Sequence, residues 1–424
     1  IVNTTDAAPT MNLRLAVGLT TVLASPLCQA QPPILNLYTF ESPPYQMVGS
    51  DTGGESQISG ETADTVICAA NRAGWSTRIR ITPQNRAIHS LERNMIDGYF
   101  AIDPSAELDT IATRSDPVAL EKWYFFTRDD KAFTKDLRIG VVAGSNEEAW
   151  LSAKGYGIFL SVSSPSQLLA LLKRGRIDTA LMDERVMDRL RQAKELAGTQ
   201  LRAHFVRYAP LYLYLGETFT SDNPEFLGIF NRTLNSCMAG QLALSQEEDR
   251  RISELSSRLF KEMNSILDVR QIIDEGPRQE SFTDVMTIDS QWTALSPLAV
   301  PDLAADILAL PGSKALQAWQ HSHQGLVTEV MLVNDMGTLA AMSQLTSDYW
   351  QGDEPKFQKV IENQATQPGG DPPIYLSPIR YDKSAARFQV TASRPVLNDH
   401  GEPALGVIVI GLSIEEALSD SEQY

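Results

Sequence analysis

Residues 137–150 read LRIGVVAGSNEEAW. The apolar run IGVV predicts a β-strand, and the acidic sequence after it predicts the start of a helix. The turn between them consists of Gly144, Ser145 and Asn146. Because backbone N–H groups at a helix N-terminus can bind an anion, we interpret this turn as a candidate site for a carboxylate.

A second stretch, residues 171–184, reads LLKRGRIDTALMDE. It predicts the end of a helix, a turn at Gly175 and a strand that carries Asp183 to its carboxyl end. Ligands of open α/β sheets bind at that end of the strands. The turn of the first stretch and Asp183 could together hold both ends of a small zwitterion. A helix cap is the alternative role for Asp183.

These two stretches resemble the second lobe of the periplasmic solute-binding proteins of the polar amino-acid type, the extracellular solute-binding family 3. In that family a Gly-Ser-Thr turn takes the carboxylate of the ligand, and an Asp after Gly-Arg-x-Asp takes its amino group. Gly144, Ser145, Asn146 and Asp183 match these positions, with Asn146 in place of the usual Thr. The resemblance implies an α/β chain with the two-lobed type II periplasmic-binding fold.

The order of elements before and after these stretches extends the resemblance. From the strand ILNLYTF onward, strands alternate with helices, which implies a largely parallel sheet. Two aromatic-rich extended runs, residues 117–128 and 203–217, would cross between the lobes and make the first lobe discontinuous. The predicted boundaries are residues 31–245 for the solute-binding domain, about 31–125 and 210–245 for lobe 1, and about 126–209 for lobe 2.

Loops after the strands of lobe 1 supply further candidates, because loops at strand ends carry function. The family's carboxylate-binding Arg is replaced by Leu108, which removes the strongest contact available to a carboxylate. Arg86 is a candidate substitute, and a solvated charge at a helix end is the alternative. The candidates for ligand binding in lobe 1 are Phe40, Glu41, Tyr45, Arg86 and Asp103.

The amino-terminal region predicts export. Residues 11–30 combine Arg14, the apolar run LAVGLTTVLA and a cleavage position near Ala30, which is the pattern of a signal peptide. We therefore expect a periplasmic protein. No later segment has about 20 consecutive apolar residues, so we expect no insertion into a membrane.

The mature chain would keep Cys68 and Cys237. Two cysteines in an exported protein favour a disulfide, and the resemblance places both on lobe 1. Two separate buried thiols are the alternative, because the sequence does not give the Cα separation that a disulfide requires.

The carboxyl-terminal part has a different pattern. Residues 246–275 predict an amphipathic connector helix. Residues 276–424 resemble the PAS-like sensor domains called Cache or PDC, with an α+β fold, on the motifs TSDYWQGDEPKF and RPVLNDHGEPALGVIVIGL. That resemblance implies a second pocket beneath the segment after the second strand. Its candidate residues are Tyr349, Trp350, Asp353, Arg380 and Arg387, with a helix cap as the alternative role for Asp353.

The net charge and the absence of certain motifs argue against several classes of function. The formal charge of -17 and the pI near 4.8 disfavour nucleic acid and anionic membranes, which need a basic surface. The motifs G-x-S-x-G and H-E-x-x-H do not occur, and the HSH at residues 321–323 lacks the further ligands of a metal site.

The sequence thus predicts a non-enzymatic solute-binding protein without a metal or cofactor. It would capture a small polar solute for ABC transport or for signal transduction, with a membrane transporter or a separate sensor protein as its partner. The alternatives are a dehydratase-like enzyme on the same fold, with Glu41, Asp103 or Asp183 as acid or base, and a structural adaptor.

Overall fold

The computed structural model describes residues 32–49, 57–128, 134, 136–195, 198–238, 242–296, 299–363, 372–382, 387–398 and 404–418. The predicted signal peptide at residues 11–30 lies outside these ranges. Among the described residues, no helix has the length and apolar character needed to cross a membrane.

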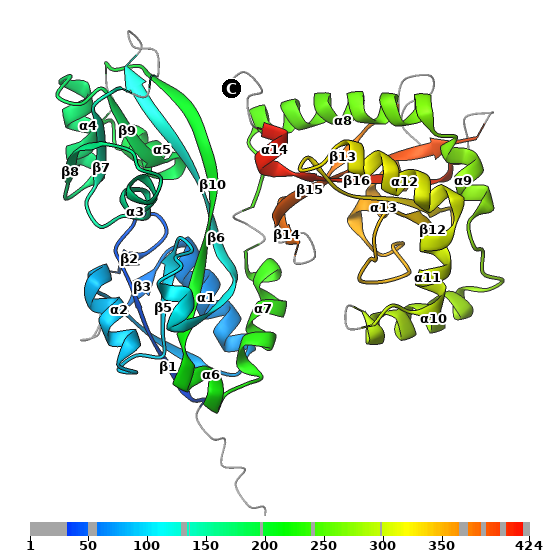
Figure 1. The fold of residues 1–424 in the computed structure, drawn as a ribbon, viewed down its shortest axis with the longest axis horizontal. Helices are drawn as coiled ribbons and strands as arrows, with labels where there is room; N and C mark the ends of the chain where they lie inside the picture. The colour runs from blue at the N-terminus through cyan, green and yellow to red at the C-terminus, as the bar shows by residue number, and fades with distance from the viewer. Residues whose placement is uncertain are drawn as a thin grey trace, which may run out of the picture.

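An eight-stranded mixed sheet organises the first half of the chain (Figure 1). Its strand order is β4-β1-β5-β10-β6-β9-β7-β8. Parallel pairing joins β1 to β4 and β5 in lobe 1, and β7 to β8 and β9 in lobe 2. The strands are β1 (Ile34–Thr39), β4 (Ser76–Ile81), β5 (Gly98–Ile102), β6 (Ala112–Arg128), β7 (Ile139–Val142), β8 (Ile158–Val162), β9 (Thr179–Asp183) and β10 (Leu201–Gly216).

Two long strands, β6 and β10, connect the lobes. They contain 17 and 16 residues and pair antiparallel from Leu201 opposite Arg128 to Gly216 opposite Ala112. At one end β10 pairs with β5 of lobe 1, and at the other end β6 pairs with β9 of lobe 2. The crossing runs predicted at residues 117–128 and 203–217 fall largely on these two strands, which we call the hinge strands.

Helices cover the sheet where the sequence supplies apolar faces and caps. The helix α4 illustrates this: Ser164 caps its start, Pro165 occupies its first turn, and Leu168 and Leu172 are buried. Lobe 1 contains α1 (Glu61–Arg72), α2 (Gln84–Glu92), η1 (Leu108–Thr110), α6 (Glu217–Asp222), α7 (Phe226–Cys237) and the hairpin β2 (Met47–Val48) and β3 (Ile58–Ser59). Lobe 2 contains α3 (Asn146–Ala153), α4 (Pro165–Lys173) and α5 (Glu184–Gln192).

The predicted connector is two helices, not one. The first, α8 (Gln246–Ile266), begins with a capping box in which Ser245 and Glu248 bind each other's backbone N–H. The second, α9 (Val269–Glu275), follows a break at Leu267, where Asp268 accepts a hydrogen bond from the N–H of Gln271. The extended conformation of Leu267 ends α8, and α9 runs in a different direction (Figure 1).

The C-terminal domain is an antiparallel sheet with helices, as the α+β prediction states (Figure 1). Its strand order is β12-β11-β16-β15-β13, and β14 also pairs with β15. The strands are β11 (Val327–Asn334), β12 (Leu339–Met342), β13 (Tyr375–Leu376), β14 (Arg380–Asp382), β15 (Arg387–Leu397) and β16 (Ala404–Ser413). The helices are α10 (Phe282–Leu295), α11 (Asp302–Ala309), α12 (Pro311–Ser322), α13 (Pro355–Asn363) and α14 (Ile414–Leu418).

One hydrophobic core is shared by lobe 1 and the C-terminal domain. It contains Phe230 of α7, Phe260 of α8, and Ile410 and Ile414 from the end of the chain, all almost fully buried. Because one continuous core supports both parts, the C-terminal domain is packed against lobe 1 and the hinge strands.

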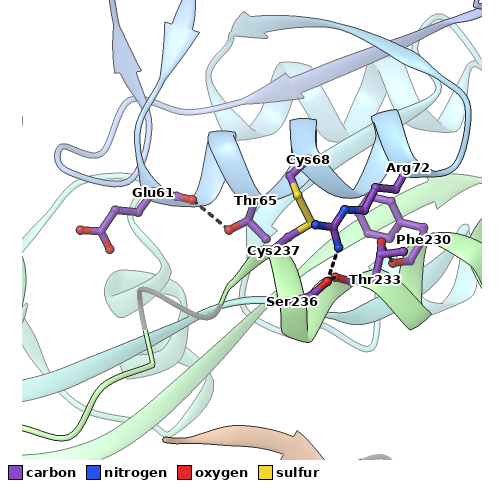
Figure 2. The surroundings of a disulfide bond; sticks show 8 residues. All are labelled: Glu61, Thr65, Cys68, Arg72, Phe230, Thr233, Ser236 and Cys237. Atoms are coloured by element: carbon purple, nitrogen blue, oxygen red, sulfur yellow. Dashed lines mark hydrogen bonds between the residues drawn. A yellow bond between two sulfur atoms is a disulfide. The ribbon is translucent and has the colours of Figure 1, made fainter.

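A disulfide joins Cys68 of α1 to Cys237 of α7, with 5.9 Å between their Cα atoms (Figure 2). This separation is normal for a disulfide. The predicted bridge is thus confirmed. It fastens the last helix of lobe 1 to the first one, next to the hydrogen bond from Arg72 to Ser236.

Candidate functional site

A cavity of about 740 Å³ lies between the two lobes. The loop after β5 and the start of α2 form the side that belongs to lobe 1, and α3 forms the side that belongs to lobe 2. The hinge strand β10 and the helix α14 complete it. The lining residues are Gln84, Ile88, Ile102, Asp103, Pro104, Ser105, Ala106, Glu107, Leu108, Asn146, Ala149, Trp150, Ala153, Lys154, Val206, Arg207 and Glu415.

An ion pair between Asp103 of lobe 1 and Arg207 of the hinge strand β10 lies in this cavity. Arg207 Nη2 lies 3.3 Å from Asp103 Oδ1, and Arg207 Nη1 lies 3.4 Å from Asp103 Oδ2. Burial raises the pKa of Asp103, and the charge and hydrogen bond of Arg207 oppose that rise. The predicted candidate Asp103 therefore lies in the cavity, but its carboxylate already has a partner.

The side of lobe 2 contributes one aromatic ring, that of Trp150, to the lining. Trp150 stacks on Tyr156 with 5.6 Å between ring centroids and meets Trp123 edge-on at 6.0 Å. The guanidinium of Arg207 lies 5.2 Å from the centroid of Trp123. Leu108, at the position where the family carries its Arg, adds an apolar surface. The cavity thus offers charges at one place and an apolar wall at another.

Asn146 links the lobes at the edge of this cavity. Its Nδ2 donates to the carbonyl oxygen of Ala101 at 2.9 Å, and its Oδ1 accepts from the N–H of Asp103 at 3.1 Å. Ala101 has a φ of 68°, a left-handed conformation that is uncommon for a residue with a Cβ. Strained backbone of this kind often marks a functional site.

Asp183 is the second link between the lobes, and it also caps a helix. Its Oδ1 accepts from the hydroxyl of Tyr45 at 2.8 Å and from the N–H groups of Arg185 and Val186, and its Oδ2 accepts from the N–H of Lys122. The residue is only 1% exposed. Burial raises the pKa of Asp183, and these hydrogen bonds oppose the rise. The sequence predicted that Asp183 binds the solute, with a helix cap as the alternative; here Asp183 caps α5, and Tyr45 covers its carboxylate.

Two further carboxylates lie near Asp183. Glu121 on β6 is 4% exposed and accepts from Trp123 Nε1 at 2.8 Å. Burial, followed by the charge of Asp183, raises the pKa of Glu121 well above its usual range. Burial also raises the pKa of Glu147 to about 7. Among the described residues, no group of three or more His, Cys, Asp or Glu is arranged to hold a metal ion.

The predicted anion-binding turn is occupied by a side chain of the protein. Gly144 has a φ of 73°, and its N–H donates to Glu148 Oε2 at 2.6 Å. Ser145 caps α3 by accepting from the N–H of Glu148, and Ser161 donates to the other carboxylate oxygen. The sequence predicted a ligand carboxylate at this turn, whereas the carboxylate that binds here belongs to Glu148.

The remaining candidates of lobe 1 do not line the cavity. Arg86 is exposed on α2, whose other face supplies Gln84 and Ile88 to the cavity. Glu41 is exposed, and Phe40 packs against the hydrophobic core. The helical phase explains the position of Arg86, because residues two positions apart on a helix point in different directions.

A second cavity, of about 680 Å³, lies against the sheet of the C-terminal domain. Glu329 of β11 lines it and accepts from Gln389 Nε2 at 3.1 Å, and burial raises the pKa of Glu329. Gln351 is fully buried, and its Oε1 has no hydrogen-bond partner among the described residues. Arg380 lines the cavity, as does Asn235, which comes from α7 of lobe 1.

Four predicted residues of the second pocket lie elsewhere. Tyr349 is buried in the core, tilted against Trp292, and Trp350 Nε1 donates to the carbonyl oxygen of Met336. Asp353 is exposed just before α13. Arg387 donates to the carbonyl oxygen of Gly325. The segment after β12 does contribute to the lining of this cavity, through Leu345, Thr346, Ser347, Asp348, Gln351 and Glu354, which were not among the predicted residues.

Sequence reasoning missed several residues that matter here, among them Glu121, Arg207 and Glu415. A local signal exists for Glu121: it precedes Trp123 by two positions in an extended apolar run, so both side chains point to the same face of the strand. Arg207 is distant in sequence from its partner Asp103, Glu415 is distant from both lobes, and no local pattern marks either residue.

No protein-family model matches the sequence, and no curated protein matches it. Among solved structures, a histidine kinase sensor domain with similarity to periplasmic binding proteins is 15% identical over 49% of this chain and 90% of that chain, with a TM-score of 0.41. The substrate-binding protein of an amino acid ABC transporter is 17% identical over 49% and 94%, with a TM-score of 0.38.

A third structure, an ancestral amino-acid-binding protein that is a precursor of cyclohexadienyl dehydratase, is 17% identical over 48% of this chain and 88% of that chain, with a TM-score of 0.37. These likenesses concern the fold and cover about half of this chain. The lobes joined by β6 and β10 have the mixed α/β architecture of the type II periplasmic-binding fold, as predicted.

Proposed function

We propose that this chain is a solute-binding protein that encloses a small polar solute between its two lobes, for transport or for sensing. The cavity of about 740 Å³ between the lobes carries this proposal, because both lobes and a hinge strand contribute side chains to it. A solute that touches both lobes stabilises their closed arrangement. The contacts from Asn146 to Ala101 and from Tyr45 to Asp183 would then hold the lobes together around it.

The chemistry of the cavity favours a zwitterion or a polar solute with an apolar part. Asp103 and Arg207 form an ion pair in its wall, which the two opposite charges of a zwitterion can join, and Trp150 supplies an apolar face. An amino acid or a similar organic zwitterion has these groups. Export to the periplasm belongs to the same proposal, and the disulfide between Cys68 and Cys237 supports it because disulfides persist in oxidising compartments.

Isothermal titration calorimetry with the twenty amino acids tests the proposal. We expect saturable heat with at least one of them. Trp150→Ala should weaken that binding by about tenfold, since loss of an apolar contact of this size costs about 1.5 kcal/mol or more. Phe159→Ala is the control, because Phe159 lies in the same lobe, is 56% exposed and is not part of the cavity lining. Equal effects of both substitutions would contradict a site at the cavity.

The C-terminal domain would carry a second site, in keeping with its resemblance to Cache or PDC sensor domains. The cavity lined by Glu329, Gln351 and Arg380 supports this proposal, because a buried amide oxygen without a partner among the described residues can accept a hydrogen bond from a ligand. A solute that binds in this second cavity should give its own binding heat in calorimetry, and Arg380→Ala should change that heat. Arg387→Ala is the matched control, since Arg387 binds Gly325 and does not line this cavity.

A dehydratase-like enzyme is the second candidate function. Asp103 favours it, because this carboxyl lines the interlobe cavity and burial raises its pKa, so it lies where it can exchange a proton with a bound solute. The protein would be incubated with the solute that calorimetry identifies, and the mixture analysed by mass spectrometry. Loss of water from the solute, abolished by Asp103→Asn, would establish the enzyme. If the solute is unchanged, solute binding without a reaction remains as the function.

A further inference from the structure

Glu415 reaches the interlobe cavity from the other domain. It belongs to α14, near the end of the chain, and lines the cavity together with Asp103 and Arg207. Its neighbours Ile414 and Leu418 are buried in the shared core, and Arg251 Nη2 of α8 donates to the carbonyl oxygen of Leu418 at 3.0 Å. Because these contacts anchor α14 on both sides, the position of Glu415 in the wall is fixed by the fold.

Glu415 affects the net charge of the wall of the interlobe cavity. The lining contains three carboxylates, Asp103, Glu107 and Glu415, and two cations, Lys154 and Arg207. The carboxylate of Asp103 forms an ion pair with the guanidinium of Arg207. With that ion pair formed, Glu415 and Glu107 outnumber Lys154, so the wall carries an excess of negative charge. Glu415 also interacts electrostatically with Arg207, and its pKa is raised by burial while the charge of Arg207 opposes the rise.

We propose that Glu415 is a specificity-determining residue of the interlobe cavity, by which the C-terminal domain favours solutes with a cationic group and disfavours anions. The inference rests on the proposed solute-binding function and adds two points to it. The binding site is a composite of both domains, and its charge selection is set by the domain that does not close around the solute. A negative wall attracts a cation and repels an anion at close range, where salt screens little.

The first experiment needs no solute. Iodide and caesium quench tryptophan fluorescence according to the local electrostatic potential, and Trp150 in the cavity wall is the reporter. Its signal is obtained as the difference between a protein and the same protein with Trp150→Phe. Glu415→Gln should raise the iodide quenching constant of Trp150 by about 1.5-fold and lower that of caesium, as removal of one negative charge from the wall that contains Trp150 predicts.

Glu416→Gln is the matched control, because Glu416 is the adjacent exposed carboxylate of the same helix and is not part of the cavity lining. It should leave both constants unchanged. Equal constants for Glu415→Gln and the unchanged protein, with normal quenching by neutral acrylamide, would overturn the proposal.

The second experiment compares arginine, glutamine and glutamate by calorimetry. Glu415→Gln should reduce the preference for arginine over glutamate by about threefold or more, whereas Glu416→Gln should not. An unchanged preference would overturn the role of Glu415 in specificity while the proposed function stands. If none of the three binds, these three amino acids are excluded as solutes, and the quenching experiment alone decides whether Glu415 sets the potential in the cavity.

Discussion

Lys122 and Glu248 form a buried ion pair between a hinge strand and the first turn of α8, with Lys122 Nζ 2.6 Å from one carboxylate oxygen and 2.7 Å from the other. Tyr208, opposite Lys122 on β10, donates its hydroxyl to the same carboxylate at 2.6 Å. The N–H of Lys122 donates to Asp183 in the cleft. One residue of the hinge therefore contacts both the interlobe cleft and the helix that leads to the C-terminal domain.

Breaking this pair should destabilise the protein strongly. Glu248→Gln leaves the Lys122 ammonium buried without its counter-charge, and loss of one partner of a buried pair costs about 3–5 kcal/mol. Urea unfolding followed by fluorescence measures the loss. Glu254→Gln on the same helix is the control, since the pair of Arg250 and Glu254 is more than half exposed and should contribute less than about 1 kcal/mol.

The same pair predicts a dependence on pH. Burial alone would raise the pKa of Glu248, but the charge of Lys122 and the hydrogen bonds of Lys122 and Tyr208 outweigh it, so the pKa is lowered. A carboxyl with a lowered pKa stabilises the fold above its unfolded pKa, near 4.5, and this contribution is lost as the pH falls through the folded value. The difference in stability between the unchanged protein and Glu248→Gln should shrink on acidification. A constant difference from pH 7 to pH 3 would contradict this.

Glu147 should behave in the opposite way. Its folded pKa of about 7 lies above the ordinary value of 4.5, so the folded state holds the proton more tightly. Stability is therefore lost as the pH rises from about 4.5 to about 7. Glu147→Gln, which mimics the protonated form, should raise the melting temperature at pH 8 and leave it nearly unchanged at pH 4. Thermal unfolding at both pH values is the measurement, and equal effects at both would argue against a raised pKa.

Substitution of Asp183 should affect stability as well as binding. Asp183→Ala removes the cap of α5, worth about 1 kcal/mol, and leaves the buried hydroxyl of Tyr45 without its acceptor, worth about 1–3 kcal/mol. We expect a loss of about 2–4 kcal/mol in urea unfolding of the free protein. Ser164→Ala, which removes only the cap of α4, should cost about 1 kcal/mol. Unfolding of the Asp183 variant at the unchanged urea concentration would show that these contacts do not form in solution.

The disulfide should contribute measurably to stability. Reduction of Cys68–Cys237 opens a long loop, since the two residues are separated by 169 positions, and should cost about 2–5 kcal/mol. Denaturant unfolding with and without reductant measures this, and alkylation followed by intact-mass analysis confirms the state of the thiols. Cys68→Ser with Cys237→Ser should reproduce the reduced protein. Two thiols that react before reduction would exclude the bridge.

The sequence by itself determined the local elements of this protein. Alternating strands and helices, the turn at Gly144 and the strand that ends at Asp183 follow from apolar periodicity and from residues that favour turns and caps. The place of the long hinge strands could also be read from the two aromatic-rich runs. These features depend on neighbours within a few positions, so a pattern in the sequence contains the information.

Only the tertiary structure decided which groups are free to bind a solute. Glu148 fills the turn at Gly144, Tyr45 covers Asp183, and Asp103 neutralises Arg207. Glu415 enters the cavity from a helix at the other end of the chain. Burial and the nearest opposite charge determine whether a polar group has a partner and where its pKa lies, and both depend on residues that are distant in sequence and meet only when the chain is folded.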